Sequence, residues 1–259
     1  VMARWNLRRG ACQPGVSPRE RTTWRRLADA LVDGYDPRTR IYEQCAGFHE
    51  LEPLVISRTA PRRPVAADLL LGRERVRQAQ IVKQPDVLML HQMLPDAVHR
   101  GSLVPNLDYY EPRTAHGSSL SPGIHASLFA RVGRDDEALE ALRLTARLDL
   151  DDVTRTTAGG VHLAAMGSVW QALVHGFAGV RPHPRHLALD PRLPSAWSAL
   201  EIPLQHAGRH LRIRIERDVL TLTTDNPLVI RLADGPMRRL AAGETRYRRR
   251  RDDWEEETR

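Results

Sequence analysis

The stretch from Asn106 to Ser121, NLDYYEPRTAHGSSLS, concentrates side chains that could bind an anion or move a proton. Acids, an arginine and a histidine precede one glycine and three serines, and the stretch ends where a helix is expected to begin. A helix start presents unbonded backbone N–H groups and the positive end of the helix dipole, which together attract an anion. This chemistry favours phosphate as the ligand. The alternative is that the serines only cap the helix and that Glu111 pairs with Arg113.

Four consecutive residues are the candidates for contact with that anion. Gly117 lets the backbone approach a ligand closely, and Ser118 and Ser119 add neutral hydrogen-bond donors. His116 supplies a donor that becomes cationic near neutral pH. We therefore expect a phosphate site at His116, Gly117, Ser118 and Ser119.

The helix after this stretch has clear start and stop signals. Ser121 fits the N-cap, Pro122 fits the first helical position and Gly133 fits just past the end. A second helix is expected over 135–147, because it opens with acids and closes with arginines, as the helix dipole favours. The stretch that carries the chemistry should therefore enter a well-defined helix.

The remainder of the first two-thirds also has helical periodicity. Thr22 or Thr23 could cap a helix that Gly34 ends, whereas residues 38–64 are irregular and resemble a long functional loop. Further helices are expected at about 69–80 and 85–94. Residues 156–180 lack Asp, Glu, Lys and Arg over a membrane-spanning length, but glycines, histidines and polar residues interrupt them. We expect an interior helix there, packed on all sides, rather than a membrane span.

The periodicity changes after Arg181. Prolines become frequent, and apolar residues then alternate with polar ones over 211–216, with short strands expected at 219–222 and 228–232. The sequence thus predicts a mainly α protein with a small antiparallel sheet domain at its C-terminal end. The expected divisions are a helical domain over 1–183, a sheet domain over 184–245 and a charged tail over 246–259.

Composition excludes some classes of protein. The net charge is +7 and the pI is about 10.2, but much of the excess lies in the arginine run from 246 to 251, which is expected to be a solvated or disordered tail. Aromatic residues make up only 5%, too few for a platform that stacks single-stranded bases, so nucleic-acid binding is not expected. Two cysteines far apart in the sequence suggest a reducing compartment, in which each is expected to be a small buried side chain. No signal peptide is evident, so a cytoplasmic location is expected. Scattered histidines show no shared ligand spacing, and no metal is expected.

Several long segments, in order, resemble glycoside hydrolase family 65, the family of maltose, trehalose and kojibiose phosphorylases. YEPRTAHGSSLSPGIHA, residues 110–126, is similar to the family's long motif. IYEQCAGFHEL, residues 41–51, resembles its "EQF-GF" loop with Cys45 in place of an aromatic residue, and IVKQPDVLML, residues 81–90, resembles its KQADV segment with Pro85 in place of alanine. The similarity continues in two further segments, GGVHLAAMGSVWQALVHGFAGVR (residues 159–181) and LPSAWSALEIPL (residues 193–204). The second segment leads into the family's C-terminal sheet, and the resemblance extends to about residue 230.

The resemblance implies a fold, a reaction and site residues. The fold would be the C-terminal portion of an (α/α)6 barrel followed by the small β-sheet domain. The reaction would be inverting cleavage of an α-linked disaccharide by inorganic phosphate, with no other cofactor, since one carboxylic acid protonates the leaving oxygen while phosphate attacks the opposite face. Lys83 and Gln84 would hold glucose hydroxyls, and His116, Ser118 and Ser119 would hold phosphate. Glu111 could orient sugar hydroxyls or Arg113, or act as the base for water in hydrolytic relatives.

One departure from the family limits these expectations. The family's general-acid glutamate lies in a DEYH-type motif shortly before the segment that resembles ARWNL, residues 3–7, and no DEYH occurs in these 259 residues. We expect the isolated chain to be inactive and to need the N-terminal part of the enzyme, with a homo-oligomer as a further option. The alternatives are a glycoside hydrolase of the same fold that uses water, and a non-catalytic sugar-binding module.

Overall fold

The structure, a computed structural model, describes residues 1–60, 63–251 and 253–257. Its contacts fall into two compact units, the first made of residues 1–124 and 151–161 and the second of residues 125–150 and 162–259. The expected order, a helical region followed by a sheet domain, is confirmed. The compact units do not follow the expected boundary at 183/184, because most of α8 and all of α9, α10 and η4 are grouped with the sheets.

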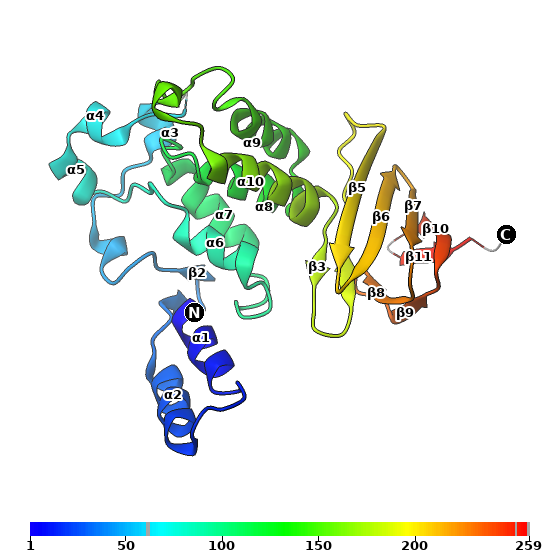
Figure 1. The fold of residues 1–259 in the computed structure, drawn as a ribbon. Helices are drawn as coiled ribbons and strands as arrows, with labels where there is room; N and C mark the ends of the chain where they lie inside the picture. Colours follow the sequence, from blue (N-terminus) through cyan, green and yellow to red (C-terminus); the bar gives the residue numbers. More distant parts are fainter. Residues whose placement is uncertain (61–62, 252, 258–259) are drawn as a thin grey trace. The chain divides into compact units, whose positions relative to one another are not determined.

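The first unit is built from short helices and connecting turns (Figure 1). Its α-helices are α1 Met2–Gly10, α2 Pro18–Ala30, α3 Ile56–Thr59, α4 Ala67–Leu71, α5 Arg73–Arg77, α6 Asp86–Met93 and α7 Leu103–Tyr110, and α8 Ser121–Val132 begins in this unit and continues in the other. Its short strands and 3-10 turns are β1 Tyr35–Asp36, β2 Ile41–Tyr42, η1 Phe48–Glu50, η2 Glu111–Arg113 and η3 Thr157–Gly159. Residues 38–60 and 63–64 are largely irregular, as expected, and residues 61–62 of that expected loop lie outside the described residues.

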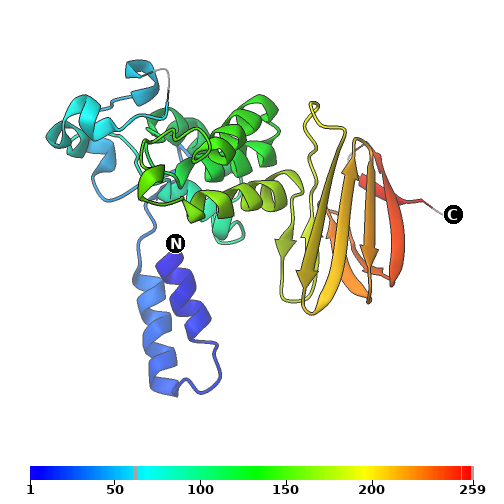
Figure 2. The same cartoon turned by 45° about the horizontal axis from the view of Figure 1, so that its top comes forward.

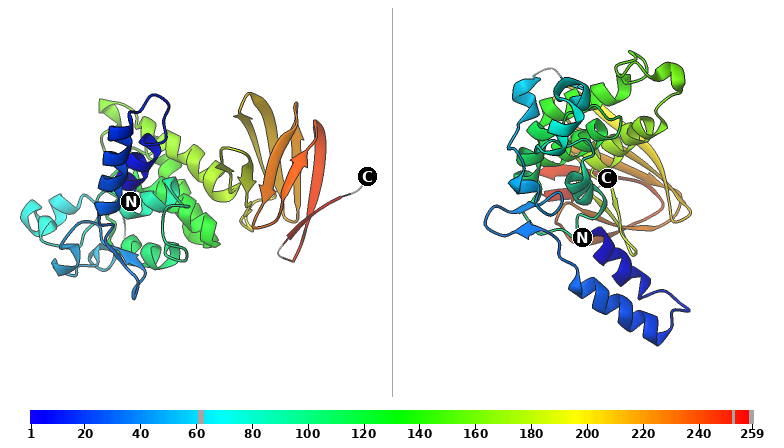
Figure 3. Two further views of the ribbon diagram at one scale, coloured as in Figure 1. Left: turned by 90° about the horizontal axis from the view of Figure 1, so that it is seen from below. Right: turned by 90° about the vertical axis from the view of Figure 1, so that its left-hand side faces the viewer.

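Two helix boundaries in this unit differ from the expectation. Helix α2 begins earlier, because Ser17 and Glu20 form a capping box, so the cap is neither Thr22 nor Thr23. The helix expected over 69–80 is two short helices, α4 and α5, that meet at Gly72, whose φ of +81° suits glycine. Helices α1 and α2 pack against each other as a hairpin, visible from two further sides in Figure 3.

Buried hydrogen bonds connect residues 40–42 of the irregular segment to helix α7. The Asn106 side chain, fully buried, accepts a hydrogen bond from the Tyr42 amide at 2.9 Å and donates to the carbonyls of Arg40 and Ser102. The Tyr110 hydroxyl donates to the Tyr42 carbonyl, and burial raises the pKa of the Tyr110 hydroxyl. These bonds fix the C-terminal end of α7, from which the candidate functional stretch departs.

The second unit combines helices with two β-sheets. Its helical elements are the second part of α8, α9 Asp135–Arg147, α10 Leu163–Gln171 and the π-helical turn η4 Ala172–Phe177. Its strands are β3 Arg181–Pro182, β4 Leu187–Leu189, β5 Ala199–His206, β6 Arg209–Glu216, β7 Val219–Thr224, β8 Leu228–Leu232, β9 Met237–Leu240, β10 Gly243–Arg250 and β11 Asp253–Glu256. The long strands β5, β6 and β7 run side by side (Figure 2).

The two sheets share one apolar core. The five-stranded sheet has the order β11-β10-β7-β6-β5 and the four-stranded sheet the order β3-β4-β8-β9. Alternate residues of β6, namely Leu211, Ile213 and Ile215, join Ile230 of β8 and Trp254 of β11 in that core. All pairings are antiparallel except β4 with β8, which is parallel, so the expectation of a purely antiparallel domain needs that correction.

The arginine run is not a tail. Residues 246–250 belong to β10, where Tyr247 is buried and points into the core, and β10 pairs with both β7 and β11. Arg246 and Arg248 form ion pairs with Glu257, and Arg250 with Glu255. The run is therefore part of a strand, in which Arg246, Arg248 and Arg250 lie on the face opposite the buried Tyr247.

Two expectations about burial are also wrong. Helix α10 is not packed on all sides, because Leu163, Met166 and Trp170 are 74%, 50% and 50% exposed. Both cysteines, Cys12 and Cys45, are exposed free thiols rather than buried side chains. Within residues 1–60, 63–251 and 253–257, no helix has the length and apolar composition that a bilayer crossing requires.

Candidate functional site

The loop between η2 and α8, residues 114–120, is fixed at its start by backbone pairing with two other segments. The Ala115 amide donates to the Val82 carbonyl at 3.1 Å, and the Ala115 carbonyl accepts from the Val65 amide at 3.0 Å. Parallel bridges join Val65 with His116 and Val82 with Thr114. Two segments far apart in sequence therefore hold the start of the 114–120 loop, which lies wholly within the first unit.

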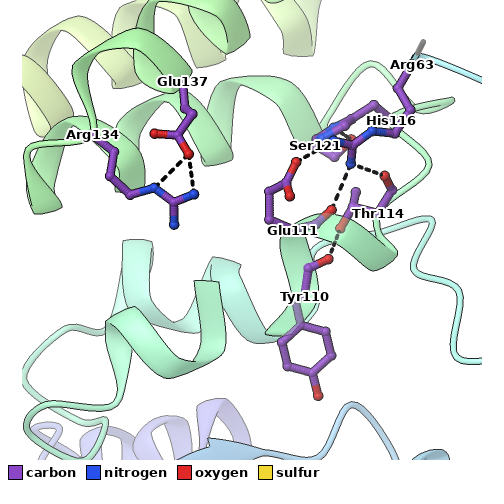
Figure 4. A network of polar contacts seen from close by, with 8 residues as sticks. All are labelled: Arg63, Tyr110, Glu111, Thr114, His116, Ser121, Arg134 and Glu137. Atoms are coloured by element: carbon purple, nitrogen blue, oxygen red, sulfur yellow. Dashed lines mark hydrogen bonds and ion pairs between the residues drawn. The ribbon is translucent and has the colours of Figure 1, made fainter. Parts of the chain in front are cut away.

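His116 is the buried member of the candidate phosphate site. It is 7% exposed, its φ of +54° is in the left-handed region, and its ring Nδ1 lies 3.0 Å from the Ser121 hydroxyl (Figure 4). The Ser121 hydroxyl in turn lies 3.4 Å from the Ser118 carbonyl. The structure thus brings His116 to the first residue of α8, where the sequence predicted the anion-attracting helix start.

Gly117 is required by a close approach rather than by its backbone angles. A Cβ atom on this residue would lie 2.3 Å from the Val65 carbonyl oxygen. No real Cβ contact is this short, so any side chain would force the loop away from the Val65 segment. The glycine predicted for contact with a ligand therefore also allows the loop to pack against its own support.

Ser118 and Ser119 occupy the outer part of the loop, where both are partly exposed. The Ser118 hydroxyl accepts weakly from the Leu120 amide at 3.4 Å. Lys83 and Gln84 are exposed and directly follow Val82, the residue that pairs with the loop. The structure therefore places the predicted sugar-binding pair next in sequence to a segment that supports the predicted phosphate loop.

Glu111 and Arg113 do not pair with each other. The Glu111 carboxylate forms an ion pair with Arg63, with 2.5 Å between Arg63 Nη2 and Glu111 Oε1 (Figure 4). Arg113 instead stacks over the Tyr109 ring at 3.9 Å and donates to the Tyr109 carbonyl at 2.9 Å. The Glu111–Arg113 pair, which was one part of the alternative interpretation of the stretch, is therefore wrong.

Gln80 is a second residue whose role the sequence did not reveal. Its buried side chain donates to the carbonyls of His49 and Leu51, and its Oε1 accepts from the Tyr109 hydroxyl at 2.8 Å and from Arg113 Nε at 3.3 Å. It thereby joins the 41–51 loop to the start of the candidate site. Nothing in the local pattern distinguished Gln80 or Arg63 from the other polar residues around them.

The arrangement suits binding and orientation of an anion. A buried imidazole, two partly exposed hydroxyls and a helix start lie within one short loop, and such groups are hydrogen-bond donors for a phosphate. The described part of the chain contains no group of three or more His, Cys, Asp or Glu side chains that could hold a metal ion. A carboxylic acid placed to protonate a leaving oxygen is not among the residues of this loop.

Comparisons with known proteins identify the family to which the chain belongs. The profile of the glycosyl hydrolase family 65 central catalytic domain matches residues 1–171, and that of the glycosyl hydrolase family 65 C-terminal domain matches residues 180–238. The chain is 32% identical over 222 residues to an alpha,alpha-trehalose phosphorylase of Thermoanaerobacter brockii, covering 85% of this chain and 29% of that protein. It is also 38% identical over 161 residues to a kojibiose phosphorylase of Escherichia coli K12, which covers 62% of this chain and 21% of that protein.

A solved structure is similar over most of the chain. A provisionally named kojibiose phosphorylase from the human microbiome superposes with a TM-score of 0.80 at 27% sequence identity, covering 91% of this chain and 32% of the other. The chain thus spans between about a fifth and a third of the length of these relatives.

Proposed function

Because the chain belongs to glycosyl hydrolase family 65, we propose that it is part of an inverting disaccharide phosphorylase that cleaves an α-glucosidic bond with inorganic phosphate. The observation that carries the proposal is the 114–120 loop, which places His116, Ser118 and Ser119 together at the start of α8. Inorganic phosphate is then a co-substrate, and no other cofactor is required.

In this proposal the residues of the chain bind and orient the reactants. Phosphate is held by the side chains of His116, Ser118 and Ser119 and by the backbone at Gly117. The hydroxyl groups of the glucose unit are held by Lys83 and Gln84. Phosphate is already an anionic nucleophile, so it attacks the anomeric carbon without a carboxylate base. A carboxylic acid on the opposite face donates its proton to the leaving oxygen.

That acid would come from outside these 259 residues. We propose that the chain acts together with the N-terminal part of a family 65 enzyme and completes an (α/α)6 barrel with it, in the cytoplasm. Helix α10 supports this proposal because one of its faces exposes an apolar stripe. The stripe consists of three residues spaced by three and four positions, Leu163, Met166 and Trp170. The much greater length of the relatives and the two free thiols are in keeping with it.

The test is direct. The 259-residue chain should bind inorganic phosphate, measured by calorimetry, and the chain joined to the N-terminal part of a family 65 enzyme should release glucose 1-phosphate from α-linked disaccharides such as kojibiose, trehalose or maltose. Release of glucose in phosphate-free buffer that Glu111→Gln abolishes would instead support a hydrolase with Glu111 as the base. Sugar binding without either reaction in the joined protein would support a non-catalytic module.

A further inference from the structure

Arg63 reaches three acceptors around the turn η2. Its Nη1 donates to the carbonyl oxygens of Glu111 at 2.8 Å and of Thr114 at 2.9 Å, and its Nη2 contacts Glu111 Oε1 at 2.5 Å. The Arg63 and Glu111 side chains are only 18% and 22% exposed. A guanidinium can satisfy three acceptors at once because its donors are fixed in one plane.

These acceptors lie at both ends of the turn that leads into the candidate phosphate loop. Glu111 begins η2 and Thr114 follows its last residue. Two residues after Arg63, the Val65 amide donates to the Ala115 carbonyl, and the Val65 carbonyl is the atom against which Gly117 packs. The short segment from Arg63 to Val65 therefore contacts the chain at four points between residues 111 and 117.

We infer that Arg63 is the positioning residue of the phosphate loop, and that it sets the shape in which His116, Ser118 and Ser119 receive the anion. The inference rests on the proposed phosphate function of the 114–120 loop. Arg63 acts through the backbone of Glu111 and Thr114 rather than by contact with the ligand. The same contact commits Glu111 Oε1 to Arg63, so the carboxylate serves as an anchor for the loop rather than as a base for water.

The experiment compares Arg63→Ala, Arg63→Lys and a matched control in the 259-residue chain. The control is Arg75→Ala, which removes another arginine of the first unit that pairs with a glutamate, Glu52, at 2.8 Å but lies outside the loop and is exposed. Each variant is titrated with inorganic phosphate by calorimetry, with and without a few millimolar guanidinium chloride. Amide hydrogen exchange at Ala115 is followed by NMR.

We expect Arg63→Ala to weaken phosphate binding by about tenfold or more, which is the scale of one lost charge-assisted hydrogen bond. It should also speed exchange at the Ala115 amide. Added guanidinium should restore both, since it replaces the missing group, and Arg63→Lys should fall between Ala and wild type because an ammonium cannot reach all three acceptors. Arg75→Ala should change neither measurement.

Several results would overturn the inference. The first is that Arg63→Ala binds phosphate with wild-type affinity and shows unchanged hydrogen exchange at Ala115. A loss that Arg75→Ala shares, or that guanidinium does not reverse, shows a general structural effect. If Arg63→Ala does not fold, the Arg63→Lys variant decides: wild-type affinity for phosphate in that variant would overturn the inference. If the wild-type chain binds no phosphate, the proposed function fails, whereas the exchange measurements still test whether Arg63 holds the loop.

Discussion

The α-carbon of Gly117 faces the backbone carbonyl of Val65 so closely that a Cβ on residue 117 would lie 2.3 Å from the carbonyl oxygen. This contact explains why a glycine stands between His116 and the two serines. A larger residue would separate the 114–120 loop from the Val65 segment that supports it.

Gly117→Ala should therefore weaken phosphate binding and lower stability. Overpacking against fixed backbone costs about 1–3 kcal/mol, and the shifted loop should bind phosphate about tenfold more weakly or worse, since groups that bind one anion must all be in place. Chemical denaturation and calorimetry measure the two effects. Gly159→Ala is the control, because its Cβ would meet no atom within 4 Å, and its stability should change by less than about 0.5 kcal/mol. Equal behaviour of the two variants would contradict the prediction.

Ser118 and Ser119 should be needed for phosphate more than for sugar. Hydrogen bonds to a charged partner contribute roughly 1.5–3 kcal/mol each, so Ser118→Ala/Ser119→Ala should weaken phosphate use by about two orders of magnitude or more. The matched variant Lys83→Ala/Gln84→Ala should mainly weaken sugar binding. Calorimetric titrations of both double variants with phosphate and with glucose distinguish the loss of phosphate binding from the loss of sugar binding. A serine double variant that keeps its phosphate affinity and loses its sugar affinity would reverse the assignment.

The 259-residue chain by itself should have no phosphorylase or hydrolase activity. Its sequence contains no DEYH motif, and loss of proton donation commonly lowers the rate by about a hundredfold to ten-thousandfold. Coupled assays for glucose 1-phosphate and for glucose, with kojibiose, trehalose and maltose, measure this. Robust turnover by the purified chain would show that its acid lies within these residues.

His175 should make the chain less stable in mild acid. Burial, opposed by a hydrogen bond to the Val180 carbonyl and aided by Arg181 and Arg131, lowers the pKa of the His175 imidazole in the folded state. The unfolded chain then binds a proton from about pH 6.5 downward that the folded chain does not. The unfolding free energy should thus fall as the pH drops from about 7 through this histidine's unfolded-state pKa.

His175→Gln should remove that part of the pH dependence, because glutamine can still donate to the Val180 carbonyl and does not titrate. Urea unfolding at pH 7 and pH 5 gives the difference between wild type and variant. The same substitution at the exposed residue His210 is the control. A variant that loses as much stability as wild type between the two pH values would show that His175 is not responsible.

Local signals in the sequence were sufficient for several elements. Helix α9 has the predicted bounds of 135–147, and β6, β7 and β8 lie where alternating residues predicted strands. Helix α8 begins at Ser121, one residue before the predicted first helical position, and ends just before Gly133, as predicted. These features depend on residues close in sequence, namely caps, dipole-matched charges and period-two burial. The family was identified from the sequence for a similar reason, because its motifs are continuous segments.

Features that depend on distant partners were decided only by the tertiary structure. The arginine run from 246 to 250 was expected to be a tail, since its net charge could be read locally but its pairing with β7 and β11 could not. The exposure of α10 was missed because an apolar composition does not reveal which faces have neighbours.

The candidate site divides in the same way. The sequence by itself was enough to predict candidates for phosphate binding, because His116, Gly117, Ser118 and Ser119 are consecutive and precede a recognisable helix start. It did not reveal that Glu111 pairs with Arg63, 48 residues away, in place of Arg113. Ion-pair partners are chosen by the path of the backbone, and only the fold brings the Arg63–Val65 segment alongside the loop.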